Sequence, residues 1–202
     1  MMNYPTEDLT IDIKHGIAYQ VDRTCPIDYN DEYFDKVENK TSKKTLSELR
    51  TAIVRQHSDG LVLDVGCGDG TFLKTAGGVG YDIMPKTVKW LKDNNMFYDI
   101  SQGIGSEIDA VTCFDSLEHM PEPKEFLCKI DKQILVVSMP VIPDIRFIRQ
   151  WKHYRPDEHF WYWTNNGFIE WMDKQGFQCI DHSDAEVLAG RQDVGIFVFR
   201  RP

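Results

Sequence analysis

The chain has 202 residues, of which 42% are hydrophobic and 27% charged, and its formal net charge at pH 7 is −9. No apolar run approaches the roughly 20 residues that cross a bilayer, and the acidic balance argues against a large nucleic-acid footprint, since phosphate binding depends on Lys and Arg. The chain starts without a basic and apolar leader, and its five cysteines lack CxxC spacing. We therefore expect a cytoplasmic protein with reduced thiols and no membrane partner.

One domain is expected at 60–202, with an N-terminal extension at 1–59 that packs on it. Within the extension, apolar residues alternate from Thr10 to Val21 around a Lys-His-Gly turn, which predicts a small hairpin. An acidic and aromatic segment follows at 28–34. A helix is predicted from Thr45 to His57, where one face carries Leu46, Leu49, Ile53 and Val54.

Beyond residue 60, short apolar runs alternate with helical stretches. Strands are predicted at 61–65, 79–83, 96–99, 109–114 and 133–138, and helices at 70–76, 85–94 and 122–130. Pro140 and Pro143 open an irregular excursion, and Thr164 is placed to cap a helix that ends at Gly176. The runs 177–181 and 194–200 close the chain as strands. Such alternation favours a mainly parallel sheet covered on both faces.

A glycine-rich turn follows the first of these strands. Asp64 lies two residues before Gly66, and glycines at alternate positions let the backbone take positive φ angles and let a ligand approach the main chain. A carboxylate at Asp64 would oppose a pyrophosphate at the helix N-terminus, so the ligand is expected to carry a positive charge. S-adenosylmethionine (SAM) has this character, with a carboxylate for backbone N–H groups and an ammonium for an acidic side chain.

Asp64, Gly66, Gly68 and Gly70 match the motif D/E-x-G-x-G-x-G, and the chain thereby resembles the class I SAM-dependent methyltransferases. The resemblance covers about residues 60–200. It implies an α/β, Rossmann-like doubly wound sheet of about seven strands, mainly parallel with an antiparallel C-terminal hairpin. It also implies SAM as cofactor, with S-adenosylhomocysteine as product and Cys67 among the cofactor contacts. The alternative is a tight turn in another doubly wound enzyme.

Two further acidic residues follow strand ends. Asp82 is placed to accept hydrogen bonds from both ribose hydroxyls, and the alternative is a cap for the helix that starts near Pro85. Asp99 resembles the family position that meets the adenine amino group, although a turn Asp bonded to its own backbone explains it nearly as well. Ile83 and Ile100 are expected to supply apolar faces for the adenine ring.

The segment Val111 to Pro121 resembles the strand-four motif of a subfamily that contains ubiquinone-biosynthesis O-methyltransferases. Its polar residues follow a central strand, where ligands bind in open α/β sheets. Asp115 is expected to contact the cofactor. His119 and Glu118 are the catalytic candidates, because an imidazole with a pKa near 6.5 takes up a proton at neutral pH.

A divalent metal is the less favoured interpretation of the same motif. Asp115, Glu118 and His119 resemble the E-x-x-E-H set that binds metal in some ubiquinone-pathway and small-RNA 2′-O-methyltransferases, and their spacing allows convergence on one face of a turn. The first residue is shorter by one methylene. A further histidine would have to come from His153 or His159. Alternatively, Glu118 and His119 only order the turn.

Two aromatic or basic stretches complete the motifs. His159 to Thr164 is read as an aromatic loop that walls the acceptor pocket or packs in the core. Arg146 to Arg155 is the only dense basic stretch, and a solvated helix face explains it best. We therefore predict a SAM-dependent methyltransferase that acts on oxygen or nitrogen of a small molecule. An RNA methyltransferase and a non-catalytic SAM-binding protein are the alternatives, and the oligomeric state is open.

Overall fold

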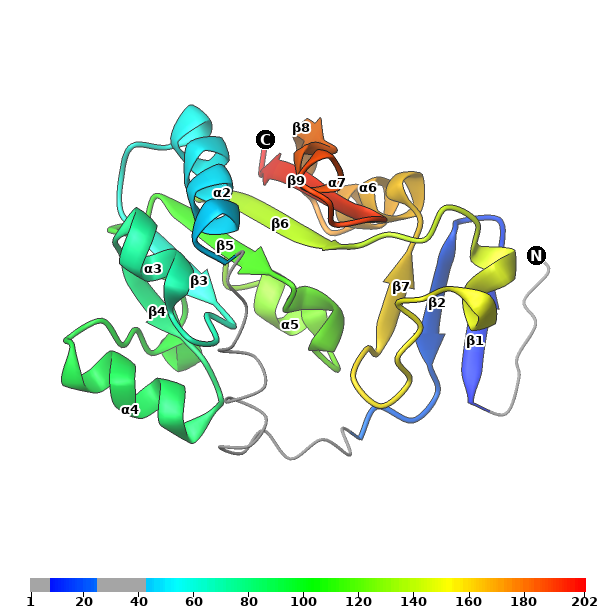
Figure 1. The fold of residues 1–202 in the computed structure, drawn as a ribbon, viewed down its shortest axis with the longest axis horizontal. Helices are drawn as coiled ribbons and strands as arrows, with labels where there is room; N and C mark the ends of the chain where they lie inside the picture. Colours follow the sequence, from blue (N-terminus) through cyan, green and yellow to red (C-terminus); the bar gives the residue numbers. More distant parts are fainter. Residues whose placement is uncertain (1–7, 25–42) are drawn as a thin grey trace. The chain divides into compact units, whose positions relative to one another are not determined.

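The computed structural model describes residues 8–24 and 43–202 (Figure 1). The acidic and aromatic segment at 28–34 lies outside the described residues, as does Cys25. The described chain forms two compact units. We call residues 43–114 and 128–137 the glycine-turn unit, and residues 8–24, 115–127 and 138–202 the histidine unit. Across these ranges, no helix combines the length and apolar character needed to cross a membrane.

The larger sheet has six strands in the order β4-β3-β5-β6-β9-β8. Its strands are β3 (Val62–Val65), β4 (Val79–Tyr81), β5 (Ala110–Phe114), β6 (Ile134–Pro140), β8 (Gln178–Ser183) and β9 (Val194–Arg200). β3 pairs in parallel with β4 and β5, whereas β8 and β9 are antiparallel. Every residue of β3 and β5 is buried, as expected where both faces of a sheet are covered. The predicted Rossmann-like α/β fold with its antiparallel C-terminal hairpin is confirmed.

The strand predicted at 96–99 is reduced to one isolated parallel bridge between Gly80 and Phe97. The chain turns at once into the 3-10 helix η1 (Ile100–Gln102). The Asp99 carboxylate accepts the Ser101 amide at 2.9 Å, which draws the backbone away from the sheet. The sheet therefore has six strands where about seven were expected.

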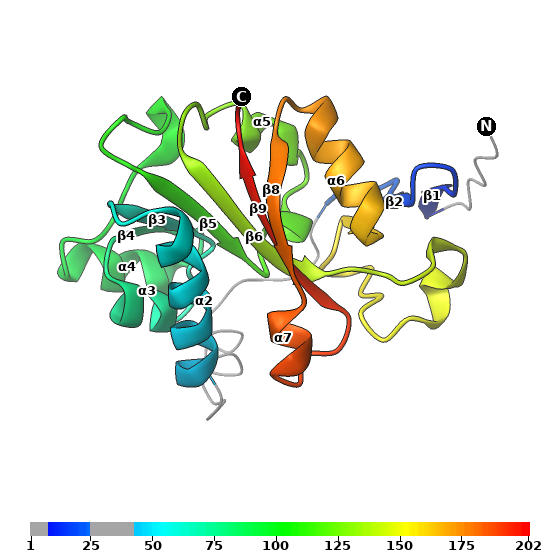
Figure 2. The same ribbon diagram turned by 90° about the horizontal axis from the view of Figure 1, so that it is seen from above.

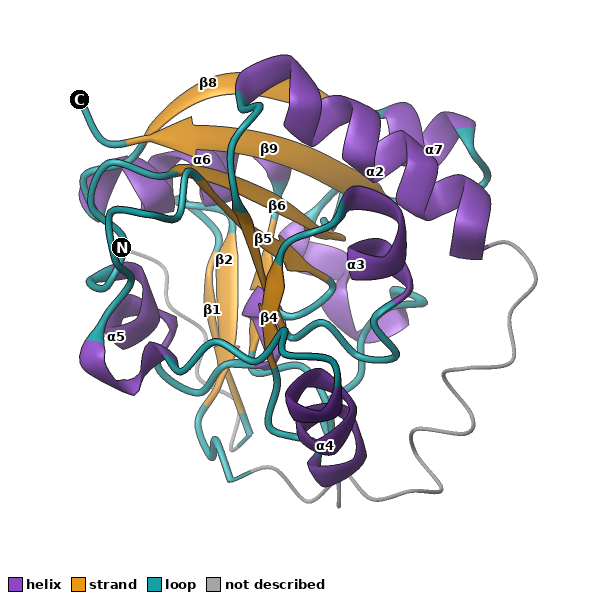
Figure 3. Ribbon diagram, turned by 90° about the vertical axis from the view of Figure 1, so that its left-hand side faces the viewer, coloured by secondary structure: helices purple, strands orange, loops and turns teal. Residues whose placement is uncertain are grey.

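Three helices belong to the glycine-turn unit: α2 (Lys43–His57), α3 (Thr71–Ala76) and α4 (Pro85–Asp93). Figure 3 shows α2 lying along α3. The buried stripe of α2 consists of Ser47, Arg50, Ile53 and Val54. The predicted apolar face is thus wrong in its first half, because Leu46 and Leu49 are only half-buried. Arg50 takes the inward position, since its guanidinium lies over the Phe114 ring, 4.5 Å from the centroid.

Of the two helices predicted in the part of the chain that forms the histidine unit, one agrees with the sequence pattern and one is shorter. α6 (Asn165–Lys174) begins as predicted, because Thr164 Oγ1 accepts the Gly167 amide at 3.0 Å. By contrast, α5 covers only Pro123–Leu127. Two 3-10 helices, η2 (Leu117–His119) and η3 (Ile145–Gln150), are present, and α7 (Ala185–Leu188) lies in the connection between β8 and β9 (Figure 2).

A second, three-stranded antiparallel sheet lies in the histidine unit, in the order β1-β2-β7 (Figure 1). The predicted hairpin is present as β1 (Leu9–Asp12) and β2 (Ile17–Gln20). The expectation of a loop at 159–164 is wrong, because β7 (Trp161–Trp163) is a fully buried strand paired with Ile17–Tyr19. Large aromatic side chains favour a pleated, packed surface, which explains this outcome.

Candidate cofactor and catalytic sites

The glycine turn has the backbone that its sequence predicts. Gly66 and Gly68 have φ angles of 77° and 56°. Nothing lies within 4 Å of the position that a Cβ on Gly68 would occupy, so the main chain is open there. The turn's amides are largely used internally: the Gly66 amide donates to the Tyr81 carbonyl at 2.8 Å, and the Gly70 amide donates to the Cys67 carbonyl at 3.0 Å. A ligand can therefore approach the main chain of the turn closely at Gly68, but the amides of Gly66 and Gly70 are not free to donate to it.

Cys67, which was expected to contact the cofactor, is nearly buried between the two glycines. Burial raises the pKa of its thiol, and the nearby carboxylates of Asp64 and Asp82 raise it further. Its sulfur belongs to a small cluster with Leu73 and Leu91. The side chain therefore behaves as packing under the turn, and only its backbone shares in the open surface.

Asp82 follows the end of β4 and connects that strand to the glycine turn. Its Oδ2 accepts the Gly68 amide at 2.8 Å, and its Oδ1 accepts the Met84 amide at 2.8 Å, just before α4. The second bond orders the turn before α4, but it is not a helix cap, because the N-cap of α4 is Met84 and no side chain caps it. Burial raises the pKa of Asp82, while hydrogen bonds from the backbone amides of Met84, Gly68 and Ile83 act in the opposite direction.

Asp64 is buried on β3, with 3% of its surface exposed. Burial raises its pKa to about 7, and the neighbouring Asp82 adds to this, whereas Thr112 and Arg50 oppose it. Thr112 Oγ1 donates to Asp64 Oδ1 at 2.6 Å. Sequence reasoning missed both partners, although Thr112 is a polar residue within an apolar strand and Arg50 lies three residues before Ile53 on α2.

The residues expected at the adenine differ in exposure. Ile83 is 66% exposed immediately after Asp82, whereas Ile100 is buried at 8%. The Asp99 carboxylate is engaged by the Ser101 amide, which lowers its pKa. This is the turn interpretation of Asp99 that the sequence left open. A surface depression of about 670 Å³ adjoins Asp99 and is also lined by Tyr98 and Ile104.

In the histidine unit, η2 brings Glu118 and His119 next to His159. One ligand atom of each of these three side chains lies within 4.8 Å of the other two. The His119 and His159 rings meet edge to face, with centroids 4.7 Å apart. The Phe160 amide donates to the Glu118 carbonyl at 2.9 Å, which joins η2 to the strand β7.

Both histidines of this cluster are neutral at pH 7. Burial lowers the pKa of His119, although the charges of Glu158 and Asp115 oppose the effect. Burial also lowers the pKa of His159 to about 3, reinforced by His119 and Arg155. Nδ1 of His119 is buried and has no hydrogen-bond partner among the described residues. Whichever tautomer His119 adopts, its Nδ1 is therefore a buried donor or acceptor without a protein partner among the described residues.

Asp115 does not join the set that the sequence grouped with Glu118 and His119. It takes a left-handed backbone conformation with φ 54°, and its Oδ1 accepts Arg191 Nη2 at 2.9 Å. The expected Asp115-Glu118-His119 set is therefore replaced by Glu118, His119 and His159. Arg191 was not identified from the sequence, because nothing local links it to a strand end 76 residues earlier.

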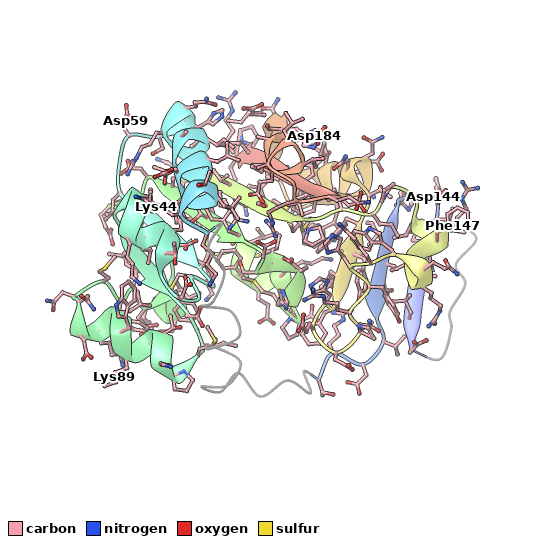
Figure 4. All side chains as sticks on the ribbon, in the orientation of Figure 1. Lys44, Asp59, Lys89, Asp144, Phe147 and Asp184 are labelled. Atoms are coloured by element: carbon pink, nitrogen blue, oxygen red, sulfur yellow. The ribbon has the colours of Figure 1, made fainter. Side chains whose placement is uncertain are left out.

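The three arginines of the basic stretch are paired with carboxylates of the same unit. Arg146 pairs with Asp144, Arg149 with Asp8 and Arg155 with Glu158. Figure 4 labels Asp144 beside Phe147, whose side chain is 60% exposed. Paired arginines offer little net charge to a phosphate backbone, so the solvated-surface interpretation of this stretch is favoured over a nucleic-acid site.

The fold and the glycine turn with its acidic strand ends define a class I SAM-dependent methyltransferase. A family model described as "Methyltransferase domain" matches residues 37–182. The chain belongs to this family, and SAM is its methyl donor. A comparison with curated proteins finds no match.

Solved structures share the fold at low sequence identity. The chain is similar to a methyltransferase of Thermotoga maritima described as a possible histamine N-methyltransferase (12% identity, 85% of this chain and 97% of that chain, TM-score 0.61). It is also similar to the 1,6-didemethyltoxoflavin-N1-methyltransferase of Burkholderia thailandensis (14%, 92% and 95%, 0.58). A third is the magnesium protoporphyrin IX methyltransferase of Synechocystis PCC 6803 with bound S-adenosylhomocysteine (19%, 79% and 83%, 0.53).

Proposed function

We propose that this methyltransferase acts on oxygen or nitrogen of a small molecule and that His119 is its general base. The observation that carries the second claim is the buried, neutral imidazole of His119 beside Glu118, with Nδ1 unpartnered among the described residues. The acidic net charge and the paired arginines support a small acceptor over RNA. Neighbours named for toxoflavin and porphyrin methylation support the same class. The likeness to ubiquinone-type O-methyltransferases stays a prediction.

The residues proposed to hold SAM lie in the glycine-turn unit. The open main chain at Gly68 and the Asp82 carboxylate beside it fit a nucleoside ligand, and exposed Ile83 offers an apolar contact for its base. Gly66, Cys67, Asp99 and Ile100 complete the proposed surroundings, and Asp64 supplies negative charge toward the ammonium. When bound, SAM supplies an electrophilic methyl group on a positively charged sulfur.

His119 is proposed to take the acceptor's proton. As the acceptor's oxygen or nitrogen forms its bond to the methyl carbon, the bond between that carbon and sulfur breaks and S-adenosylhomocysteine is the leaving group. The acceptor's O–H or N–H proton passes to the imidazole and later to solvent. Glu118, whose Oε1 lies 4.0 Å from His119 Nε2, stabilises the imidazolium that forms. Asp115, which follows β5 directly, is proposed to lie near the cofactor.

The test is turnover of labelled SAM with a fractionated metabolite extract. His119→Gln should lower kcat about 100-fold or more while leaving SAM affinity unchanged, because general-base catalysis contributes at least about this factor. His153→Gln is the matched control, since His153 Nε2 donates to the Gln192 carbonyl at 3.0 Å and His153 is not a member of the Glu118, His119 and His159 cluster. An unchanged kcat in His119→Gln would contradict the assignment. SAM binding without turnover of any fraction would favour the non-catalytic alternative.

A metal at Glu118, His119 and His159 is the competing interpretation of this cluster. Two imidazoles and one carboxylate are a donor set that suits divalent transition metals. Elemental analysis of purified protein and activity after chelation distinguish the two cases. Stoichiometric metal, with loss of activity on chelation and recovery on reloading, would assign His119 as a ligand and remove its role as base.

A further inference from the structure

Gly68 lies at the first central position of a four-residue turn, which the Gly70 amide closes by donating to the Cys67 carbonyl at 3.0 Å. The φ angle of Gly68 is 56°, and a positive φ at this position defines the turn types that favour glycine there. The peptide between Gly68 and Asp69 is the central peptide of the turn, and neither its carbonyl nor its amide takes part in the closing hydrogen bond. Contacts from outside the turn must therefore decide which way this peptide faces.

Thr87 supplies such a contact from the first turn of α4. Its side chain is fully buried, and its Oγ1 donates to the Gly68 carbonyl at 2.7 Å. A threonine within a helix commonly bonds a carbonyl of its own preceding turn, whereas Thr87 bonds a residue 19 positions earlier. The Gly68 amide is held as well, because it donates to Asp82 Oδ2 at 2.8 Å. Both backbone polar groups of Gly68 are thus fixed by the connection that leads from β4 into α4.

The contact from Thr87 also sets the direction of the Asp69 amide. In a planar trans peptide, the carbonyl oxygen and the following amide hydrogen point to opposite sides, so a carbonyl held by Thr87 turns the Asp69 N–H away from that residue. This amide donates to no group among the described residues, whereas the Asp69 side chain accepts the Thr71 amide and Lys43. The Asp69 N–H is therefore a donor for a ligand, next to the open main chain at Gly68.

We propose that Thr87 is a positioning residue for SAM, which acts through the peptide between Gly68 and Asp69. This rests on the proposed placement of SAM at the glycine turn. Removal of the Thr87 hydroxyl removes the contact that opposes rotation of this peptide. A rotated peptide presents the Gly68 carbonyl in place of the Asp69 N–H, so an oxygen atom of SAM would meet an acceptor instead of a donor and binding would weaken.

The test uses variants of Thr87 that differ in the hydroxyl. Thr87→Val is nearly isosteric with the wild type, and Thr87→Ser keeps the hydroxyl with one methyl group fewer. In calorimetric titration of the full chain with SAM, Thr87→Val should raise the Kd about tenfold and Thr87→Ser should stay within about twofold of the wild type. If Thr87→Val does not fold, Thr87→Ala takes its place, and its Kd should exceed that of Thr87→Ser by about tenfold.

Thr51→Val is the matched control. Thr51 Oγ1 also donates to a backbone carbonyl at 2.7 Å, but that carbonyl belongs to Ser47 within α2 and not to the glycine turn. The Kd for SAM should therefore be unchanged in Thr51→Val. Urea unfolding of all variants measures the accompanying change in stability, and a merely structural role of Thr87 predicts lower stability with an unchanged Kd of the folded protein.

An unchanged Kd in Thr87→Val, or a Kd in Thr87→Ser as high as that in Thr87→Val, would overturn the assignment of Thr87. The placement of SAM survives that result if Gly68→Ala and Asp82→Ala still weaken binding. Wild-type affinity in both of these variants would instead defeat the placement itself. A raised Kd in Thr87→Val that Thr87→Ser restores would establish Thr87 as a positioning residue.

Discussion

Acidification is expected to weaken SAM binding through Asp64. Burial raises the pKa of this carboxyl to about 7 in the ligand-free protein. A cationic ammonium nearby favours the ionised carboxylate, so binding requires Asp64 to lose its proton. Below about pH 7 the affinity should fall as the proton competes, and above that pH it should level off. Between pH 8 and pH 6 the expected loss is about tenfold, or ~1.4 kcal/mol.

Isothermal titration calorimetry with SAM across this pH range measures the effect directly. Repeating the titration at pH 7 in buffers of different ionisation enthalpy should reveal the release of about 0.5 proton per SAM bound, since Asp64 is then half protonated. Asp64→Asn should bind more weakly at pH 8 and lose the pH dependence. Thr112→Val removes a hydrogen bond to the ionised carboxylate, so it should move the inflection to higher pH.

The same pH dependence of SAM affinity in wild type and Asp64→Asn would contradict this role of Asp64. A wild-type affinity that is flat between pH 6 and pH 8 would contradict it equally. Either result would mean that the ammonium lies too far from Asp64 to influence its ionisation. S-adenosylhomocysteine, which keeps the ammonium but lacks the sulfonium charge, should reproduce the slope and so separates the two cationic centres of SAM.

Three further outcomes are expected. Asp82→Ala should weaken SAM binding about 100-fold or more by calorimetry, because it removes charge-assisted hydrogen bonds to the ribose; near wild-type affinity would exclude that contact. Gly68 and Gly77 both have positive φ angles and open space where a Cβ would lie. Gly68→Ala and Gly77→Ala should therefore each lower the free energy of unfolding in urea by about 1 kcal/mol, but only Gly68→Ala should weaken SAM binding. Arg23→Met should lower the free energy of unfolding by about 1 kcal/mol, since the Arg23 guanidinium lies over the Trp161 ring and donates to the Pro121 carbonyl. Unchanged stability would show that these contacts make no net contribution to folding.

Local patterns were sufficient to predict the strand β3, the glycine turn and the start of α6. The run before Asp64 predicts a strand, the alternating glycines predict the positive φ angles, and Thr164 predicts its own helix cap, since each signal and its structural effect lie within a few residues. The predicted strand at 96–99 fails for a local reason too, because Asp99 bonds the next turn in preference to continuing the ladder.

The histidine unit depends on contacts between distant parts of the chain. The aromatic composition of Trp161–Trp163 is compatible with a loop or with a strand, and the segment is a strand because it pairs with β2. Likewise, Asp115 was grouped with Glu118 and His119 by spacing, but Arg191 binds Asp115 from 76 residues away. Neither outcome follows from periodicity or motif, because the deciding partner is brought close only by the fold.

The small β1-β2-β7 sheet has a consequence for synthesis of the chain. Gln20 and its partner Tyr162 are 142 residues apart. At the ribosome's pace of roughly 5–20 residues per second, the hairpin waits about 7–30 s before β7 emerges to pair with its free edge. The described residues of the glycine-turn unit all fall within 43–137 and are translated during that interval. The histidine unit is therefore completed last, after the glycine turn and its neighbouring strands have been translated.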